Sequence, residues 1–340
     1  MRILLDSRQM KQCDKNTIEH FGVPSLVLME RAALSTADEI DRYFREGGKK
    51  GQAAADRETS GKKRTALIVC GFGNNGGDGL AIGRILFQRG YEATIVMPPE
   101  SGRISEETRT QKEILGHYGI ELLHDMPKGE FDVVIDALFG IGLTRNLEGV
   151  YREYLTEMNQ KSGLKVAVDI PSGVHGDTGE VMGVGFLADL TVTFAFAKPG
   201  LLLYPGAEYA GTVLVKDIGI DSRSFLKEQP FLFAAEAEDL NGIPSRKNRS
   251  NKGSYGKVLT VAGQKNMAGA AFFSGKAAYR TAAGLVRIFT EEQNRIILQE
   301  LLPEAILTAW EGIKFPEELL SQALSWGTVI AAGPGLGTGK

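Results

Sequence analysis

Short apolar runs alternate with amphipathic stretches over roughly residues 65–220. The runs "TALIVCG" (65–71), "EATIVM" (92–97), "FDVVIDALFGIG" (131–142) and "KVAVDIPSG" (165–173) each end at or beside glycine or proline. The segments 79–90, 105–119 and 150–163 between them have helical character, and further apolar runs follow at 190–200 and 211–219. Buried strands joined by helices predict a Rossmann-like α/β fold, a doubly wound parallel sheet with helices on both faces.

The first 45 residues predict helix rather than strand. Apolar residues recur at helical spacing within a helical stretch expected over 8–45, namely Leu26, Met29, Ala33, Ala37 and Ile40. Ser25, which follows Pro24, is a candidate N-cap, and Ser105 is the expected cap of the helix that begins there. Residues 45–64 lose the periodicity and predict a solvated loop.

The alternation restarts after residue 228. Strands are expected at 253–264, 285–290 and 326–335, with an Ala-rich helix at 268–284 and a helical segment at 291–302. We therefore expect two domains, at 1–222 and 228–340. The last glycine-rich loop has no crossover helix after it, although a parallel strand needs one. This predicts an incomplete second domain with a bare strand edge.

Composition narrows the class of protein. The chain has 340 residues, a net charge of −3 and only two cysteines, Cys13 and Cys70, which are far apart. This balance favours neither nucleic acid nor an anionic membrane as a partner, and the cysteines fit a reducing compartment. No apolar run reaches the roughly 18 residues of a membrane span. The sequence therefore predicts a cytoplasmic protein that acts on a small molecule.

Polar residues gather where three of the predicted strands end. Asn74, Asn75 and Asp78 follow the first strand, Asp136 ends the third, and Asp169 and Ser172 follow the fourth. Ligands of open parallel sheets bind at these carboxyl ends, so we expect the side chains to share one site. Carboxylate, amide and hydroxyl oxygens are hard donors, and a single carboxylate among neutral oxygens favours a hard cation of low charge.

The stretch Gly71–Gly76 matches the dinucleotide fingerprint G-x-G-x-x-G. The fingerprint also requires an acidic residue at the end of the second strand, where this chain has Met97 followed by two prolines. An NAD-binding oxidoreductase and a non-catalytic nucleotide-binding module therefore stay open as alternatives. The glycines still indicate close backbone approach to a ligand.

Four segments carry a resemblance to a known family. "LVLMERAA" (26–33), "NNGGDG" (74–79), "DALFGIG" (136–142) and "VDIPSG" (168–173) resemble the NAD(P)H-hydrate epimerases, in an order and spacing that cover about residues 1–220. In the second region, "KGSYGKVLTVAG" (252–263) and "AAGPGLG" (331–337) resemble the ADP-dependent NAD(P)H-hydrate dehydratases, which have a ribokinase-like fold. The two domains are fused in a bifunctional repair enzyme of this kind.

The resemblance implies a reaction and a site. The reaction would interconvert the R and S forms of hydrated NADH or NADPH at C6 of the nicotinamide ring. Asn75, Asp136 and Ser172 would hold a potassium ion. Asp169 is the candidate acid–base residue and Lys198 the second choice. The implied substrate-binding residues are Asn74, Asn75, Gly76, Gly77, Asp78, Gly140, Ile141, Gly142, Leu143, Thr144, Arg145, Asn146, Tyr151, Asp169, and in the second region Ala270 and Gly335.

For the second region the resemblance implies ADP or ATP with magnesium as cofactors. The family's catalytic aspartate lies in a later motif that these 340 residues do not contain, so we expect no dehydratase activity from them. A homo-oligomer is possible, because the helix with Leu26, Leu28 and Met29 offers apolar residues for a dimer.

Overall fold

The computed structural model describes residues 1–47, 63–99, 103–243, 245–312 and 316–337. The chain forms two compact units, Met1–Gly242 and Ile243–Lys340. The first unit extends past the domain end expected at 222 because strand β9 (Leu232–Ala234) pairs antiparallel with β1 (Arg2–Leu4). Most of the loop predicted over 45–64 lies outside the described residues. No helix in the described ranges is long and apolar enough to cross a bilayer.

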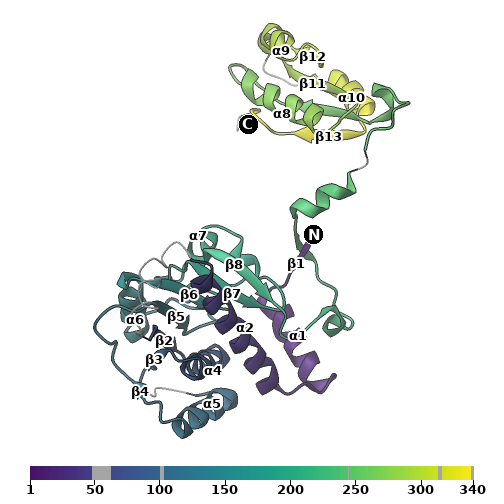
Figure 1. Ribbon diagram of the computed structural model, residues 1–340. Coiled ribbons are helices and arrows are strands. Elements are labelled where there is room, and N and C mark those ends of the chain that lie inside the picture. Colours follow the sequence, from purple (N-terminus) through teal and green to yellow (C-terminus); the bar gives the residue numbers. More distant parts are fainter. Residues whose placement is uncertain (48–62, 100–102, 244, 313–315, 338–340) are drawn as a thin grey trace. The chain divides into compact units, whose positions relative to one another are not determined.

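The first unit is built on a parallel sheet of seven strands in the order β4-β3-β2-β5-β6-β7-β8 (Figure 1). The strands are β2 (Thr65–Cys70), β3 (Glu92–Val96), β4 (Leu122–Leu123), β5 (Val133–Ala137), β6 (Leu164–Val168), β7 (Leu190–Phe194) and β8 (Thr212–Lys216). The order reverses between β2 and β5, which places a topological switch point beside these two strands. The predicted α/β class is confirmed.

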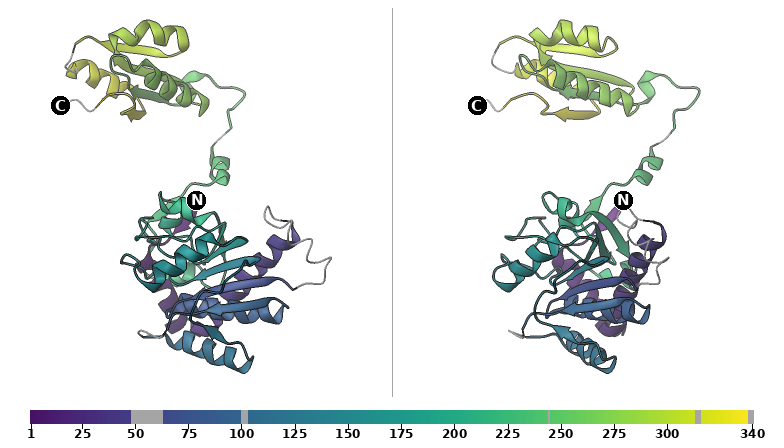
Figure 2. Two further views of the ribbon diagram at one scale, coloured as in Figure 1. Left: turned by 90° about the vertical axis from the view of Figure 1, so that its left-hand side faces the viewer. Right: turned by 60° about the vertical axis from the view of Figure 1, so that its left-hand side comes forward.

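Helices cover both faces of this sheet (Figures 1 and 2). One face packs against α1 (Ser7–Glu19), α2 (Ser25–Arg45), α4 (Asn74–Gln88) and α5 (Glu106–His117), the other against α6 (Val150–Gln160). Side chains alternate along β2, with Ile68 in the first layer and Leu67 in the second. Both faces of β2 are buried from Ala66 to Cys70, and these five residues are all apolar. A short helix, α7 (Gly206–Ala210), precedes β8.

Helix boundaries follow local chemistry. Ser105 caps α5 as predicted, since its Oγ accepts a hydrogen bond from the backbone N–H of Thr108. The cap predicted at Ser25 is wrong, because Pro24 occupies the N-cap position and Ser25 is the first helical residue. The Ser25 hydroxyl instead donates to Glu107 Oε1 at 2.7 Å. The helical stretch expected over 8–45 divides into α1 and α2 at residues 20–24.

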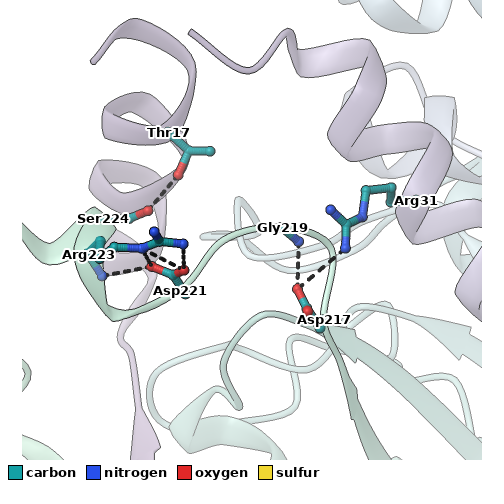
Figure 3. A network of polar contacts seen from close by, with 7 residues as sticks. All are labelled: Thr17, Arg31, Asp217, Gly219, Asp221, Arg223 and Ser224. Carbon is teal, nitrogen blue, oxygen red and sulfur yellow. Dashed lines mark hydrogen bonds and ion pairs between the residues drawn. The ribbon is translucent and has the colours of Figure 1, made fainter. Parts of the chain in front are cut away.

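The segment after β8 fastens the N-terminal helices to the unit (Figure 3). Asp217 accepts a hydrogen bond from Gly219 N and lies 3.7 Å from Arg31 of α2. In the 3-10 turn η2 (Ser222–Phe225), the Ser224 hydroxyl lies 2.7 Å from that of Thr17 in α1. The segment therefore ties both α1 and α2 to the end of the sheet.

The second unit contains a parallel sheet of four strands in the order β12-β11-β10-β13. These are β10 (Lys257–Val261), β11 (Leu285–Glu291), β12 (Ile306–Trp310) and β13 (Val329–Ala332), accompanied by α8 (Ala268–Arg280), α9 (Arg295–Leu301) and α10 (Glu317–Trp326). Neither β12 nor α10 is among the elements expected from the sequence. As expected, β13 lies at a sheet edge, where Val329 and Ile330 are 58% and 49% exposed.

A tight glycine turn joins β2 to α4. A Cβ atom at Gly76 would overlap the carbonyl oxygen of Gly71, and one at Gly71 would overlap that of Leu138. Both obstacles are backbone atoms, which cannot move away as a flexible side chain can. The first turn of α4 therefore approaches β2 and the loop after β5 only because these positions lack side chains.

Gly76→Ala should lower the free energy of unfolding by about 2 kcal/mol, the scale of an overpacked core site. Gly73→Ala is the matched control in the same turn, because a Cβ there meets nothing within 4 Å. We expect it to change the free energy of unfolding by less than about 1 kcal/mol. Urea unfolding of the two variants and the parent chain measures both effects. Equal stability of the two variants would contradict the steric explanation.

Candidate functional site

A cavity of about 520 Å³ opens at the carboxyl ends of β2, β5 and β6. Its wall combines the first turns of α4, the loop after β5, the end of β6 and the inner side of α1. Predicted site residues in this wall are Asn74, Asn75, Asp78, Gly140, Ile141, Gly142, Leu143, Asp169 and Lys198. The polar strand ends thus meet at the switch point, where open α/β sheets bind their ligands.

The two candidate catalytic residues form a buried ion pair. The Lys198 ammonium donates to Asp169 Oδ1 at 2.6 Å, to Thr193 Oγ1 at 2.9 Å and to the carbonyl oxygen of Phe194 at 3.1 Å. Thr193 Oγ1 also donates to Asp169 Oδ1, at 3.0 Å. The lysine is 1% exposed. Asp169 has a φ of +67°, in the left-handed region that Asp tolerates better than most residues.

Two further carboxyl groups lie close to this pair. Burial raises the pKa of Asp14 to about 6, with Asp169 raising it further and Lys198 opposing the rise. Burial holds the pKa of Asp78 well above its ordinary value, and the charges of Asp169 and Asp14 act in the same direction. Three carboxyl groups thus crowd around one ammonium, an arrangement that favours retention of a proton within the cluster at neutral pH.

Asp14 is the site residue that sequence reasoning missed. It comes from α1 rather than from a strand end, so the rule that collects polar strand ends passes over it. A weaker signal exists, because Asp14 lies four residues after the buried Met10 and next to the buried Cys13. This signal is weak, because charged residues commonly flank the apolar stripe of an amphipathic helix.

The predicted potassium ligands lie around the loop after β5. Asp136 is fully buried, and its carboxylate accepts from Ser172 N and Oγ, both at 2.7 Å, and from Leu138 N at 3.2 Å. Burial raises the pKa of Asp136 to about 6. The Ser172 hydroxyl in turn accepts a hydrogen bond from Phe139 N at 2.9 Å.

Asn75 approaches the same loop from α4, since a Cβ at Gly140 would lie 3.4 Å from Asn75 Oδ1. Both polar atoms of the Asn75 amide are buried without a hydrogen-bond partner among the described residues. Buried amides are normally satisfied, so this oxygen is suited to a bound ligand or ion. Amide, hydroxyl and carboxylate oxygens together fit a hard cation such as potassium.

Other predicted substrate-binding residues lie outside the lining of the cavity. Thr144, Arg145 and Asn146 are exposed beyond Leu143. Tyr151 packs edge-on against Phe139, with ring centroids 4.9 Å apart. These positions place them at a rim, where they can meet the outer part of an elongated ligand.

Two predicted glycines face the protein interior instead. Gly76 abuts Gly71, and a Cβ at Gly77 would lie 2.6 Å from Met29 Cε and 2.8 Å from Thr108 Oγ1. These close contacts explain why α4 needs glycine at both positions in order to pack. Ala270 and Gly335 belong to the second unit, where a Cβ at Gly335 would lie 2.7 Å from that of Ala270.

The sheet order and the cavity define a Rossmann-like α/β protein with a cavity at its switch point. A family model described as "YjeF-related protein N-terminus" matches residues 25–200, more than half of the chain. The NAD(P)H-hydrate epimerase of Limosilactobacillus fermentum is 42% identical over 214 residues, which cover 63% of this chain and 95% of that enzyme. The chain belongs to the NAD(P)H-hydrate epimerase family.

The second unit matches a different family model, NAD(P)H-hydrate dehydratase, over residues 258–340. The bifunctional NAD(P)H-hydrate repair enzymes of Thermofilum pendens and Moorella thermoacetica are 34% and 33% identical over 97% and 98% of this chain. The chain spans 62% and 64% of those two relatives, less than two thirds of each. The yeast protein YNL200c shares the fold, with a TM-score of 0.53 at 22% identity over 68% of this chain and 96% of that one.

Asp14→Asn should stabilise the protein at neutral pH. Because the folded-state pKa of Asp14 is raised from 3.8 to about 6, ionisation opposes folding, and this penalty grows as pH rises through that window. The amide removes the penalty, so the variant should have the higher melting temperature at pH 7.5. Its advantage should shrink as pH falls from 6 towards 4. A variant that melts lower at pH 7.5 would show that the carboxylate stabilises the fold.

Proposed function

We propose that this chain interconverts the R and S forms of hydrated NADH and NADPH at C6 of the nicotinamide ring. The observation that carries the proposal is the buried ion pair of Asp169 and Lys198 in the wall of the switch-point cavity. Membership of the epimerase family supports the choice of substrate.

The chemistry requires one C–O bond to break and re-form, with proton transfer to and from its oxygen. The C6–O bond must break and form again on the other face of the ring, and the lone pair of the adjacent ring nitrogen can expel the oxygen once an acid protonates it. Asp169 is the proposed acid–base residue. Its Oδ1 is held by Lys198 and Thr193, while a Cβ at Gly140 would lie 3.3 Å from its Oδ2. The second oxygen therefore faces the loop after β5, on the cavity side.

The remaining loop atoms would hold the rest of the dinucleotide. The segment from Gly140 to Asn146 would bind its phosphates through backbone N–H groups, with help from Arg145. Tyr151 and Asn74 would contact the substrate further out. Asn75, Asp136 and Ser172 would hold a potassium ion, whose charge would order the loop after β5 and offset the Asp136 carboxylate.

A coupled assay tests the reaction directly. When a mixture of R and S hydrates meets a purified S-specific dehydratase, the R form should be consumed only after this chain is added. Asp169→Asn should lower kcat by about 100-fold or more, the range of a lost acid–base group. Asn suits the substitution because it tolerates a positive φ. Asp217→Asn, on a side chain that is 81% exposed, is the matched control and should leave the rate unchanged.

Two outcomes would favour the alternative functions. Persistence of the R hydrate at high protein concentration with potassium present would sink the epimerase proposal and leave a binding module. Stoichiometric oxidation of a substrate with unmodified NAD would instead indicate an oxidoreductase.

Potassium should stabilise the protein at constant ionic strength. Replacing choline chloride by potassium chloride should raise the free energy of unfolding by about 1.4 kcal/mol when potassium reaches ten times its Kd. Asn75→Ala should abolish this increment, whereas Asn74→Ala, one residue away, should retain it. Thermal unfolding in the two salts gives the measurement. An increment that survives Asn75→Ala would place the ion elsewhere.

Dehydration with ADP or ATP and magnesium stays a prediction for the longer relatives of this chain. The cytoplasmic location and the homo-oligomer likewise stay predictions.

A further inference from the structure

We propose that Asp14 of α1 is a second acid–base group of the epimerase and serves the face of the nicotinamide ring opposite to the one served by Asp169 and Lys198. The inference rests on the proposed function, because it concerns the same cavity and the same reaction.

The stereochemistry of the reaction favours two proton-transfer groups. The hydroxyls of the R and S forms project from opposite faces of the ring at C6. An acid placed to protonate the leaving oxygen on one face is badly placed to take a proton from water that attacks the other face. Unless the bound ring turns over, an efficient epimerase needs a proton-transfer group on each side.

Asp14 approaches the cavity from a different element than the ion pair does. It lines the same cavity as Asp169 and Lys198 but comes from a helix, whereas the ion pair stands at the ends of β6 and β7. Electrostatic interactions link Asp14 with both members of that pair. A helix and a sheet therefore contribute separate proton-transfer groups to a single cavity.

Asp14 is half-buried in the wall of the cavity, and its carboxyl has no structural task there. In the part of the chain that the structure describes, no residue donates a hydrogen bond to it. Buried carboxyl groups with a structural role usually accept such bonds, as Asp136 does from Ser172 and Leu138. With a pKa of about 6, Asp14 can both hold and release a proton near neutral pH.

The helix that carries Asp14 is fixed at both ends. At its start, Ser7 N and Oγ donate to Asp177 Oδ1 at 2.6 and 2.7 Å. Near its end, Thr17 and Asn16 bond to Ser224, each at 2.7 Å (Figure 3 shows the Thr17 contact). Anchors on either side of Asp14 hold its carboxyl in a defined place, as acid–base catalysis requires.

Other titratable groups line the cavity with Asp14. They are Lys11 on its own helix, Asp78 on α4, Glu107 on α5, and Asp169 and Lys198 at the strand ends. Asp78 lies in α4, just after the glycine turn. Its charge and those of Asp14, Asp169 and Lys198 influence one another.

The steps balance without an oxidant or reductant. The Asp14 carboxylic acid protonates the C6 hydroxyl, the C–O bond breaks, water leaves, and the ring nitrogen lone pair forms a C=N bond. Water then attacks C6 from the other face while the group formed by Asp169 and Lys198 takes its proton, and the electron pair returns to nitrogen. Exchange with solvent returns the proton to Asp14. The opposite direction uses the same groups in reversed roles.

The test compares inversion with oxygen exchange. Each epimer is incubated in ¹⁸O-labelled water with the whole chain. The epimers are then separated by chromatography, and the ¹⁸O content of each is measured by mass spectrometry. Asp14→Asn should lower the rate of epimerisation by about 100-fold or more. It should still incorporate label, without inversion, into the one epimer whose hydroxyl faces Asp169. Glu19→Gln removes a charge from an exposed position of the same helix and should behave like the parent chain.

The outcomes separate this inference from the function on which it rests. Unchanged epimerisation by Asp14→Asn would overturn the inference alone, and so would loss of exchange from both epimers. Asp14→Glu should recover at least tenfold over Asn, and a Glu variant as slow as Asn would also overturn it. A parent chain that neither inverts nor labels the hydrates would overturn the proposed function as well.

Discussion

The buried ion pair of Lys198 and Asp169 is the interaction on which the site depends. Burying two charges costs several kcal/mol per ion unless further hydrogen bonds satisfy them. Thr193 and the carbonyl oxygen of Phe194 supply those bonds, and both lie on β7, next to β6 in the sheet. Asp169 directly follows β6 and Lys198 lies in the segment after β7, so the pairing of these two strands brings the two side chains together.

Further carboxyl groups lie close to this ion pair. Asp14 and Asp78 face a region that already contains Asp169, and Lys198 is the single ammonium of the cluster. The resulting proton affinity suits acid–base chemistry but opposes folding, which is the usual conflict between activity and stability at a functional site. Contacts elsewhere offset it, and the hydrogen bonds between α1 and Ser224 in the segment after β8 are among them (Figure 3).

Periodicity in the sequence was sufficient to predict the main sheet and the convergence of Asn75, Asp78 and Asp169, because the carboxyl ends of parallel strands lie at one edge. It could not predict β4, with two residues, or β1 and β9, with three each, since such short strands carry no period. The place of Asp14 in the cavity could not be predicted for another reason. Its place in the cavity depends on how α1 docks, and docking depends on contacts with Asp177 and Ser224, far away in the sequence.

The glycine fingerprint shows why a match of letters can mislead about the ligand. Gly71 and Gly76 are required because backbone atoms of Leu138 and Gly71 occupy the space of their missing side chains. The same close approach turns Asn75 and Asp78 towards the cavity, whereas Gly73 meets no such restriction. Packing of α4 on β2 therefore explains the glycines without any pyrophosphate, and the residues between them carry the information about function. The buried amide of Asn75 has no hydrogen-bond partner among the described residues, and a cation bound at this turn would satisfy its oxygen.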